Sequence, residues 1–199
     1  MIVGIILSAG ESRRMGTPKQ LLPWGNTIVL QRVIDVASAS RLDAILLILG
    51  HRADEIAGRI ALPPKIHMAV NGNFREGMSS SVKCGIENGP AEAEAFMLLL
   101  GDQPFIERAV IDALIDDYRS GRRGITIPVC NGRRGHPVIF DARYRAELLA
   151  VGDRGARAVV AAHAGEIFEV PVESPNILTD MDTPEQYREA ARQAENRSR

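Results

Sequence analysis

Residues 1–22 read Met1-Ile-Val-Gly-Ile-Ile-Leu-Ser-Ala-Gly-Glu-Ser-Arg-Arg-Met-Gly-Thr-Pro-Lys-Gln-Leu-Leu22, an apolar run followed by a small, basic loop. Residues 2–7 are almost all aliphatic or β-branched. Such an unbroken apolar run is typical of a strand buried on both faces of a parallel sheet that helices cover. The chain is therefore predicted to begin with the central strand of an α/β domain.

The loop after this strand combines small residues with positive charge. Its small residues are Ser8, Ala9, Gly10, Ser12 and Gly16, and its cations are Arg13, Arg14 and Lys19. Small residues let backbone N–H groups approach an anion closely, and the cations add charge at the same place. The spacing fits neither a Walker A loop nor the G-x-G-x-x-G turn of dinucleotide-binding proteins. A polyphosphate site of another kind is predicted.

Composition limits the class of protein. The 199 residues suffice for one α/β domain with a substantial core, and 25% charged residues with a net charge of −1 leave no basic footprint for nucleic acid. Cys84 and Cys130 lack metal-ligand spacing and a secretory leader, so we expect reduced thiols in a cytoplasmic protein. Residues 1–7 are too short to span a membrane.

Strand and helix patterns alternate along the rest of the chain. Strands are expected over 42–49, 66–70, 95–100, 125–129, 137–140 and 166–172. One helix is expected to follow a cap at Thr27, another to begin at the serines 79–81, and two more to span 53–60 and 107–118. Asn131-Gly132 predicts a hairpin turn inside an antiparallel excursion. Thr183 is expected to cap a last helix beginning at Pro184, with a polar tail, 190–199, that frays. This order predicts a mixed, mainly parallel sheet with helices on both faces.

Carboxylates stand at two places where a metal site is expected. Asp102 follows the strand 95–100 in Gly101-Asp-Gln-Pro104, at the edge where open α/β sheets bind ligands. Asp180 and Asp182 lie two residues apart, so they share one face in extended backbone. A role in capping alone stays open for this second pair.

The first loop resembles the signature G-x-[SG]-x-R-[ML]-G-x-x-K of nucleotidyltransferases of the MobA-like superfamily. The matching positions are Gly10, Ser12, Arg14, Met15, Gly16 and Lys19. The resemblance implies a three-layer, Rossmann-like fold of the nucleotide-diphospho-sugar transferase type. It also implies a single domain, 1–199, with a nucleotide-binding part over about 1–104 and an acceptor-side part over about 105–199.

The same resemblance implies roles for individual residues. Lys19 and Arg14 would be catalytic, and Asp102 with Asp182 would hold Mg²⁺, with Asp180 as the second choice. The nucleotide would contact Leu7, Ser8, Ala9, Gly10, Ser12, Gly16 and Ser81. The acceptor would contact His136, Arg134, Asp153 and Arg154, although the arginines of the hairpin turn also fit a solvated turn.

Two further motifs resemble the molybdenum cofactor cytidylyltransferase branch, namely Gly135-His-Pro137 and Gly152-Asp-Arg-Gly-Ala-Arg157. That branch joins CMP from CTP to molybdopterin, and an apo molybdoenzyme of the xanthine dehydrogenase type is a candidate client. The Ala9 methyl is expected to narrow the space beside the base, which favours a pyrimidine. Ser8 stands where relatives commonly have Ala. Transfer to a sugar or alditol phosphate, by a guanylyl- or cytidylyltransferase, and a non-catalytic cofactor carrier stay open as alternatives.

Overall fold

The computed structural model describes residues 1–12, 15–121, 124–152, 154–179, 181 and 183–197. In this part of the chain the main sheet has eight strands, in the order β10-β7-β9-β6-β1-β4-β5, with β8 paired to β7. The strands are β1 (Ile2–Ser8), β4 (Ala44–Leu49), β5 (Ile66–Val70), β6 (Ala95–Leu100), β7 (Ile125–Cys130), β8 (Arg133–Arg134), β9 (Val138–Asp141) and β10 (Ile167–Pro171).

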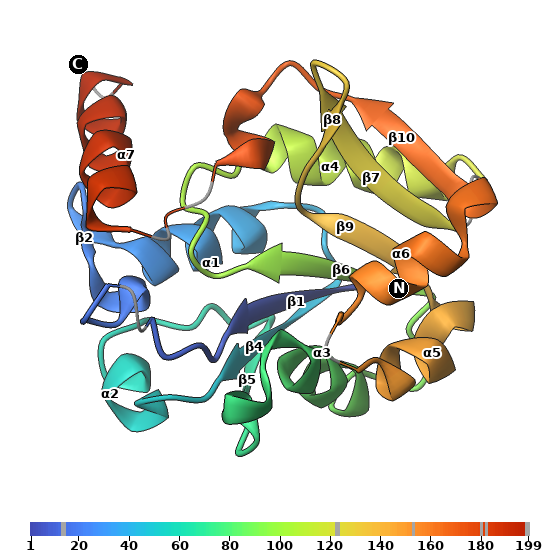
Figure 1. The fold of residues 1–199 in the computed structure, drawn as a ribbon, viewed down its shortest axis with the longest axis horizontal. Helices are drawn as coiled ribbons and strands as arrows, with labels where there is room; N and C mark the ends of the chain where they lie inside the picture. The colour runs from blue at the N-terminus through green and yellow to red at the C-terminus, as the bar shows by residue number, and fades with distance from the viewer. Residues whose placement is uncertain (13–14, 122–123, 153, 180, 182, 198–199) are drawn as a thin grey trace.

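Strand β1 lies at the centre of the parallel part of the sheet (Figure 1). It pairs in parallel with β4 on one side and with β6 on the other, and β5 continues the parallel set beyond β4. Strand β9 runs antiparallel to both β6 and β7, whereas β10 pairs in parallel with β7. The predicted mixed, mainly parallel sheet is therefore confirmed.

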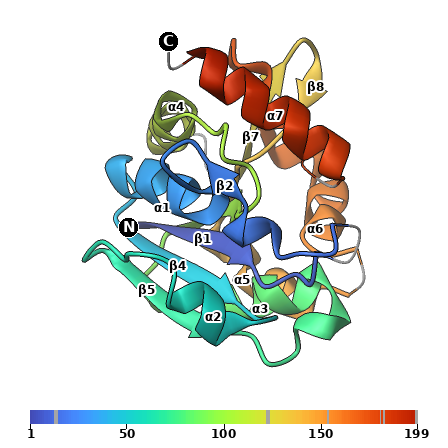
Figure 2. The same cartoon turned by 90° about the vertical axis from the view of Figure 1, so that its left-hand side faces the viewer.

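Helices cover both faces of the sheet, which makes three layers (Figures 1 and 2). They are α1 (Val29–Ala39), α2 (Ala53–Ala57), α3 (Met78–Glu87), α4 (Arg108–Arg119), α5 (Arg145–Ala150), α6 (Arg157–Ala162) and α7 (Pro184–Arg197). Apolar side chains of α1 and α4 pack with Ile6 and Leu47 on one face. Those of α3, α5 and α6 pack with Ile5 and Ile48 on the other. Burial on both faces explains why these strands are continuously apolar.

Short elements join these layers. The small hairpin β2 (Pro23–Trp24) and β3 (Thr27–Ile28) precedes α1. The 3₁₀ helices are η1 (Lys19–Leu21), η2 (Phe74–Glu76), η3 (Ala142–Tyr144), η4 (Ala164–Glu166) and η5 (Pro175–Leu178). None of the helices in the described ranges is both long and apolar enough to cross a membrane.

Two local predictions are confirmed. Asn131 and Gly132 have φ angles of 51° and 73°, as a type I′ turn between β7 and β8 requires. Thr183 precedes α7, where its Oγ1 accepts from the Gln186 N–H at 3.3 Å and its own N–H donates to Gln186 Oε1 at 3.0 Å. This reciprocal pair is a capping box with Gln as the fourth residue.

Several predicted element ends are wrong. Thr27 does not cap α1, because it belongs to β3 and Ile28 occupies the N-cap without a side-chain hydrogen bond. Helix α2 ends at Ala57 rather than residue 60, and β4 begins at Ala44 rather than residue 42. The serines 79–81 lie inside the first turn of α3, whose N-cap is Gly77.

The C-terminal tail was expected to fray from residue 190, but α7 continues to Arg197. Ala190 is buried in a small cluster with Trp24 and Phe105. The Tyr187 hydroxyl also donates to the Pro23 carbonyl oxygen at 2.7 Å, so α7 lies against the β2–β3 hairpin (Figure 1). These tertiary contacts stabilise a helix whose sequence alone is strongly polar.

Candidate active site

A pocket of about 550 Å³ opens at the carboxyl ends of β1 and β6. Leu7 and Ser8 at the end of β1 lie beside Leu100 and Gly101 at the end of β6, because the two strands pair in register from Ile2 with Ala95 to Leu7 with Leu100. Ligands of open α/β sheets bind at this edge. The sheet topology therefore brings residues almost one hundred positions apart into one site.

The loop after β1 forms one wall of the pocket and is held in shape by Gln20. The buried Gln20 side chain donates from Nε2 to the carbonyl oxygens of Ser8 at 3.0 Å and Gly10 at 3.3 Å. Because trans peptides point their C=O and N–H groups in opposite directions, the N–H groups of Ala9 and Glu11 are turned away from Gln20. In the described structure the backbone N–H groups of Ala9 and Gly10 donate to no other backbone group.

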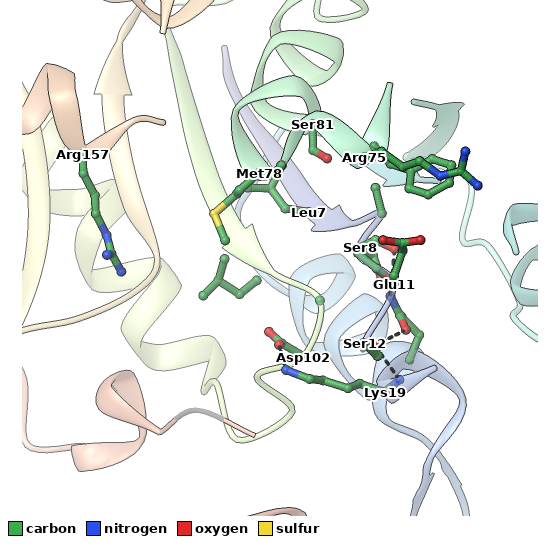
Figure 3. A pocket seen from close by; sticks show the side chains of 17 residues that line it. Leu7, Ser8, Glu11, Ser12, Lys19, Arg75, Met78, Ser81, Asp102 and Arg157 are labelled. Atoms are coloured by element: carbon green, nitrogen blue, oxygen red, sulfur yellow. Dashed lines mark hydrogen bonds and ion pairs between the residues drawn. The ribbon is translucent and has the colours of Figure 1, made fainter. Parts of the chain in front are cut away.

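Ser12 connects this loop to η1. It adopts a left-handed conformation with φ of 52°, and its Oγ accepts from the Lys19 N–H at 3.1 Å. This contact places the start of η1 beside the loop and directs the Lys19 side chain into the pocket (Figure 3).

Lys19 and Asp102 meet inside the pocket although they are 83 positions apart. The Lys19 Nζ donates to Asp102 Oδ2 at 3.1 Å, and the Lys19 side chain is only 11% exposed against 34% for Asp102. Gly101 allows this close approach of β1 and β6, since a Cβ there would lie 3.0 Å from the Leu7 carbonyl oxygen. A cation and a carboxylate thus stand side by side next to the open amides of the loop.

The opposite end of the pocket is formed by η2 and the start of α3. Ser81 is buried, and its Oγ accepts from Asn71 Nδ2 at 3.1 Å, which leaves the hydroxyl hydrogen available to a ligand. Met78 and Arg75 also line the pocket, and the Arg75 guanidinium lies 5.6 Å from the centre of the Phe74 ring. This end therefore offers the Ser81 hydroxyl and the Met78 side chain beside one guanidinium.

Arg157, the first residue of α6, lines the pocket from the side facing the loop (Figure 3). The other described lining residues all lie between Leu7 and Asp102. Arg157 is therefore the residue through which the later part of the described chain reaches this pocket.

A cluster of charged groups fixes the far end of α6. His163 contacts Glu147 of α5 through Nε2 at 2.8 Å and Glu166 through Nδ1 at 3.2 Å, and its ring lies 4.7 Å from that of Tyr144. The hydrogen bond with Glu147, assisted by Glu166, raises the pKa of His163 above its usual range although burial opposes it. Protonated His163 thus strengthens the contact between α5 and α6.

Most of the predicted nucleotide-binding, catalytic and metal-binding residues that the structure describes meet in this pocket. Those that line it are Leu7, Ser8, Ala9, Gly10, Ser12, Lys19, Ser81 and Asp102. Gly16 is exposed in a turn with φ of 69° and does not line it. Arg14, Asp153, Asp180 and Asp182 lie outside the described residues.

The predicted acceptor residues in the described structure do not line the pocket. Arg134 pairs through Nε with Glu169 Oε1 at 2.7 Å on the neighbouring part of the sheet. The His136 N–H donates to the Ile177 carbonyl oxygen at 3.1 Å, and Arg154 is exposed. Whether these three contact an acceptor stays a prediction.

The Ala9 methyl lies among buried residues. Ala9 is 3% exposed, and a Cβ on Gly50 would lie 2.8 Å from its methyl carbon, so the methyl faces Gly50. It belongs to the buried cluster that includes Ile5 and Ile48, while Ala9 also lines the pocket. The effect of this methyl on the space beside the base stays a prediction.

Sequence reasoning missed Gln20, Glu11, Phe74, Arg75, Met78 and Arg157 as residues at the pocket. Gln20 and Glu11 stand inside the first stretch, and Arg157 ends the motif that begins at Gly152. Their position in those motifs was the available signal. Their orientation depends on tertiary contacts, which motif spacing does not show.

The donor chemistry at the pocket fits a hard divalent cation. Asp102 supplies one carboxylate, and no group of three or more His, Cys, Asp or Glu side chains that could hold a metal occurs within the described ranges. Mg²⁺ commonly takes one or two protein carboxylates and completes its shell with waters and substrate phosphates. The position of Asp102 beside the predicted polyphosphate loop agrees with this coordination.

A family model described as the MobA-like NTP transferase domain matches residues 4–167. The chain belongs to this family. Its match runs from β1 through the start of β10, so it includes the described pocket lining from Leu7 to Arg157. The protein is accordingly a nucleotidyltransferase, as members of the MobA-like family are.

Individual MobA-like relatives resemble the chain over almost its whole length. The molybdenum cofactor cytidylyltransferase of Escherichia coli strain K12 is 29% identical over 184 residues, which cover 92% of each chain. The crystal structure of Rv0371c from Mycobacterium tuberculosis H37Rv is 30% identical, with a TM-score of 0.85 over 96% of this chain and 97% of that one. A structure of Rv0371c in complex with manganese has a TM-score of 0.80 at 28% identity, over 96% of this chain and 97% of that one.

Proposed function

We propose that this nucleotidyltransferase joins CMP from CTP to the terminal phosphate of molybdopterin and releases pyrophosphate. The observation that carries the proposal is the pairing of Lys19 with Asp102 beside the open amides of the first loop, with Arg157 facing them across one pocket. The choice of CTP and molybdopterin rests on the likeness to the E. coli cytidylyltransferase and on the motifs at 135–137 and 152–157.

The reaction needs alignment more than proton transfer. A phosphate oxygen of the acceptor attacks the α-phosphorus of the nucleotide, the bond from that phosphorus to the bridging oxygen breaks, and the electron pair leaves with pyrophosphate. The acceptor phosphate is already anionic near neutral pH, so no strong general base is required. Two repelling anions must instead be held in line, and the charge of the leaving group must be neutralised.

Lys19 suits the α-phosphate, where charge develops during the transfer. Its ammonium is fixed by Asp102 and is largely shielded from solvent, so its interaction with a phosphate is stronger than in water. The N–H groups of Ala9 and Gly10, together with Arg14, are proposed to bind the β- and γ-phosphates. The role of Arg14 rests on the signature alone.

Asp102 is proposed to hold Mg²⁺, with Asp182 or, as second choice, Asp180 as the further carboxylate. Mg²⁺ held by these carboxylates would supply positive charge that neutralises the phosphates. Ser81, with its hydroxyl already fixed by Asn71, is proposed to face the nucleoside at the end of the pocket opposite the Lys19–Asp102 pair.

Arg157 is proposed to bind the phosphate of the acceptor, because it reaches the pocket from the side facing Lys19. Asp153 and Arg154 precede it in the same motif, and His136 and Arg134 remain proposed acceptor contacts further along the sheet. We also propose that the reaction takes place in the cytoplasm and that an apo molybdoenzyme of the xanthine dehydrogenase type receives the product.

The test measures Mg²⁺-dependent pyrophosphate release from CTP, GTP and ATP, each with and without molybdopterin. Release that requires both CTP and molybdopterin is the expected result. Release with GTP in preference to CTP would contradict the cytidylyl assignment. Release with a sugar or alditol phosphate but not with molybdopterin would contradict the acceptor, and binding of molybdopterin without any release would indicate a carrier.

A further inference from the structure

The hydroxyl of Ser8 is an unexplained polar group at the nucleotide site. Ser8 is only 4% exposed, and its Oγ is buried without a hydrogen-bond partner among the described residues. Gln20 binds the carbonyl oxygen of Ser8 and not its hydroxyl. Buried hydroxyls in folded proteins are nearly always paired, because an unpaired one destabilises the fold. A ligand that pairs with the Ser8 hydroxyl only when it is bound would give this hydroxyl a function.

Ser8 lies at the wall of the pocket, within reach of a bound ligand if its side chain rotates. Ser8 is the last residue of β1 and lies beside Gly101, and both residues line the pocket. A Cβ on Gly101 would lie 2.7 Å from Ser8 Oγ, so the hydroxyl packs against the Gly101 backbone and fills the space that a side chain there would need. A serine side chain has three staggered positions, and a rotation about its Cα–Cβ bond directs the hydroxyl toward a ligand.

The position of Ser8 along the pocket indicates which part of a nucleotide it meets. Figure 3 shows Ser8 between the Lys19–Asp102 pair at one end and Ser81 at the other. In a nucleoside triphosphate the ribose lies between the phosphates and the base. A ribose hydroxyl both donates and accepts hydrogen bonds, as a serine hydroxyl does.

We propose that Ser8 Oγ hydrogen-bonds a ribose hydroxyl of the bound nucleotide and thereby selects ribonucleotides over deoxyribonucleotides. The inference rests on the proposed nucleotide site and adds a residue that determines its specificity. A site whose polar group binds a substrate hydroxyl rejects the analogue that lacks this hydroxyl, because the polar group of the protein then stays unpaired.

The test compares Ser8→Ala with Ser79→Ala as a matched control. Ser79 is also buried but does not line the pocket. Dissociation constants are measured by calorimetry, with Mg²⁺ present, for CTP, 2′-deoxy-CTP and 3′-deoxy-CTP. The wild-type protein should prefer CTP to one of the analogues, and Ser8→Ala should reduce that preference by about two- to tenfold, the value of one neutral hydrogen bond. Ser79→Ala should keep the wild-type preference.

Thermal unfolding separates this role from a structural one. Removal of an unpaired buried hydroxyl should leave the Tm of Ser8→Ala unchanged or raised, whereas loss of a structural hydrogen bond would lower it. An unchanged preference for CTP over both analogues in Ser8→Ala would overturn the inference while the nucleotide site stands. If CTP does not bind the wild-type protein at all, the proposed function fails instead.

Discussion

Replacement of Lys19 by Ala tests the proposed chemistry most directly. The Lys19 Nζ is held 3.1 Å from Asp102 Oδ2, and its side chain is 11% exposed, so its charge acts where little water screens it. Removal of one preorganised donor that stabilises transition-state charge typically lowers kcat by about 10²- to 10³-fold, or roughly 2.7–4 kcal/mol.

The adjacent carboxylate places the expected loss at the lower end of that range. Asp102 neutralises part of the field of Lys19 at the phosphate, so we expect kcat to fall about 100-fold in Lys19→Ala. KM for the nucleotide should rise only a few-fold, because the loop amides and the other cations still bind the phosphates. Asp102 is one-third exposed, and losing such a partly solvated pair should change the free energy of unfolding by no more than about 1 kcal/mol.

The assay is steady-state pyrophosphate release with saturating acceptor, together with urea unfolding of each variant. Lys19→Met keeps most of the buried hydrocarbon stem without the charge and should match Lys19→Ala in kcat, which separates charge from packing. Lys19→Arg should recover only part of the rate, since a planar guanidinium does not replace a compact ammonium. A kcat of Lys19→Ala within about threefold of wild type would refute the assigned role.

Two further predictions concern residues that hold the pocket walls in place, namely Gln20 in the first loop and His163 after α6. Gln20→Leu should raise the nucleotide KM and destabilise the protein by about 1–3 kcal/mol, because the buried carbonyl oxygen of Ser8 and the partly buried one of Gly10 lose their donor. Gln20→Glu should destabilise the protein further near pH 7, since a carboxylate cannot donate to these oxygens. An unchanged KM with normal urea unfolding would contradict the positioning role. The raised pKa of His163 means that its contact with Glu147 stabilises the fold fully below the unfolded pKa of about 6.5 and less as pH rises through the folded value. Glu147→Gln should therefore lower the urea midpoint more at about pH 5.5 than at about pH 9, and equal losses at both would contradict this account.

Much of the sheet could be predicted because its strands are buried on both faces. Such strands appear in the sequence as uninterrupted apolar runs, and β6 (Ala95–Leu100) was located at its observed ends. The first loop could also be predicted, since its small residues and cations are consecutive. Asp102 could be placed at the ligand-binding edge because it directly follows a buried strand.

Contacts between distant segments could not be predicted in this way. The extension of α7 depends on Ala190 packing near Trp24, and the orientation of Arg134 depends on Glu169, 35 positions away. Nor does the pattern around Ala9 indicate that its methyl faces Gly50. Each of these features depends on which side chain of another element lies next to the residue. Hydrophobic periodicity in the sequence indicates only which side of a helix or strand is buried.

The antiparallel strand β9 explains why two substrates could meet at this pocket. The parallel strands β6, β1, β4 and β5 bring their carboxyl ends to one edge, where Ser8, Lys19 and Asp102 gather. Beyond β6, β9 reverses direction, and the chain after it supplies α6, whose first residue, Arg157, reaches the same pocket. If the proposed roles hold, the loops of the parallel strands select the nucleotide, and the chain after β9 selects the acceptor. Because Lys19 and Asp102 lie where these two parts of the chain face each other, either specificity could change by substitution without displacing the pair that carries the chemistry.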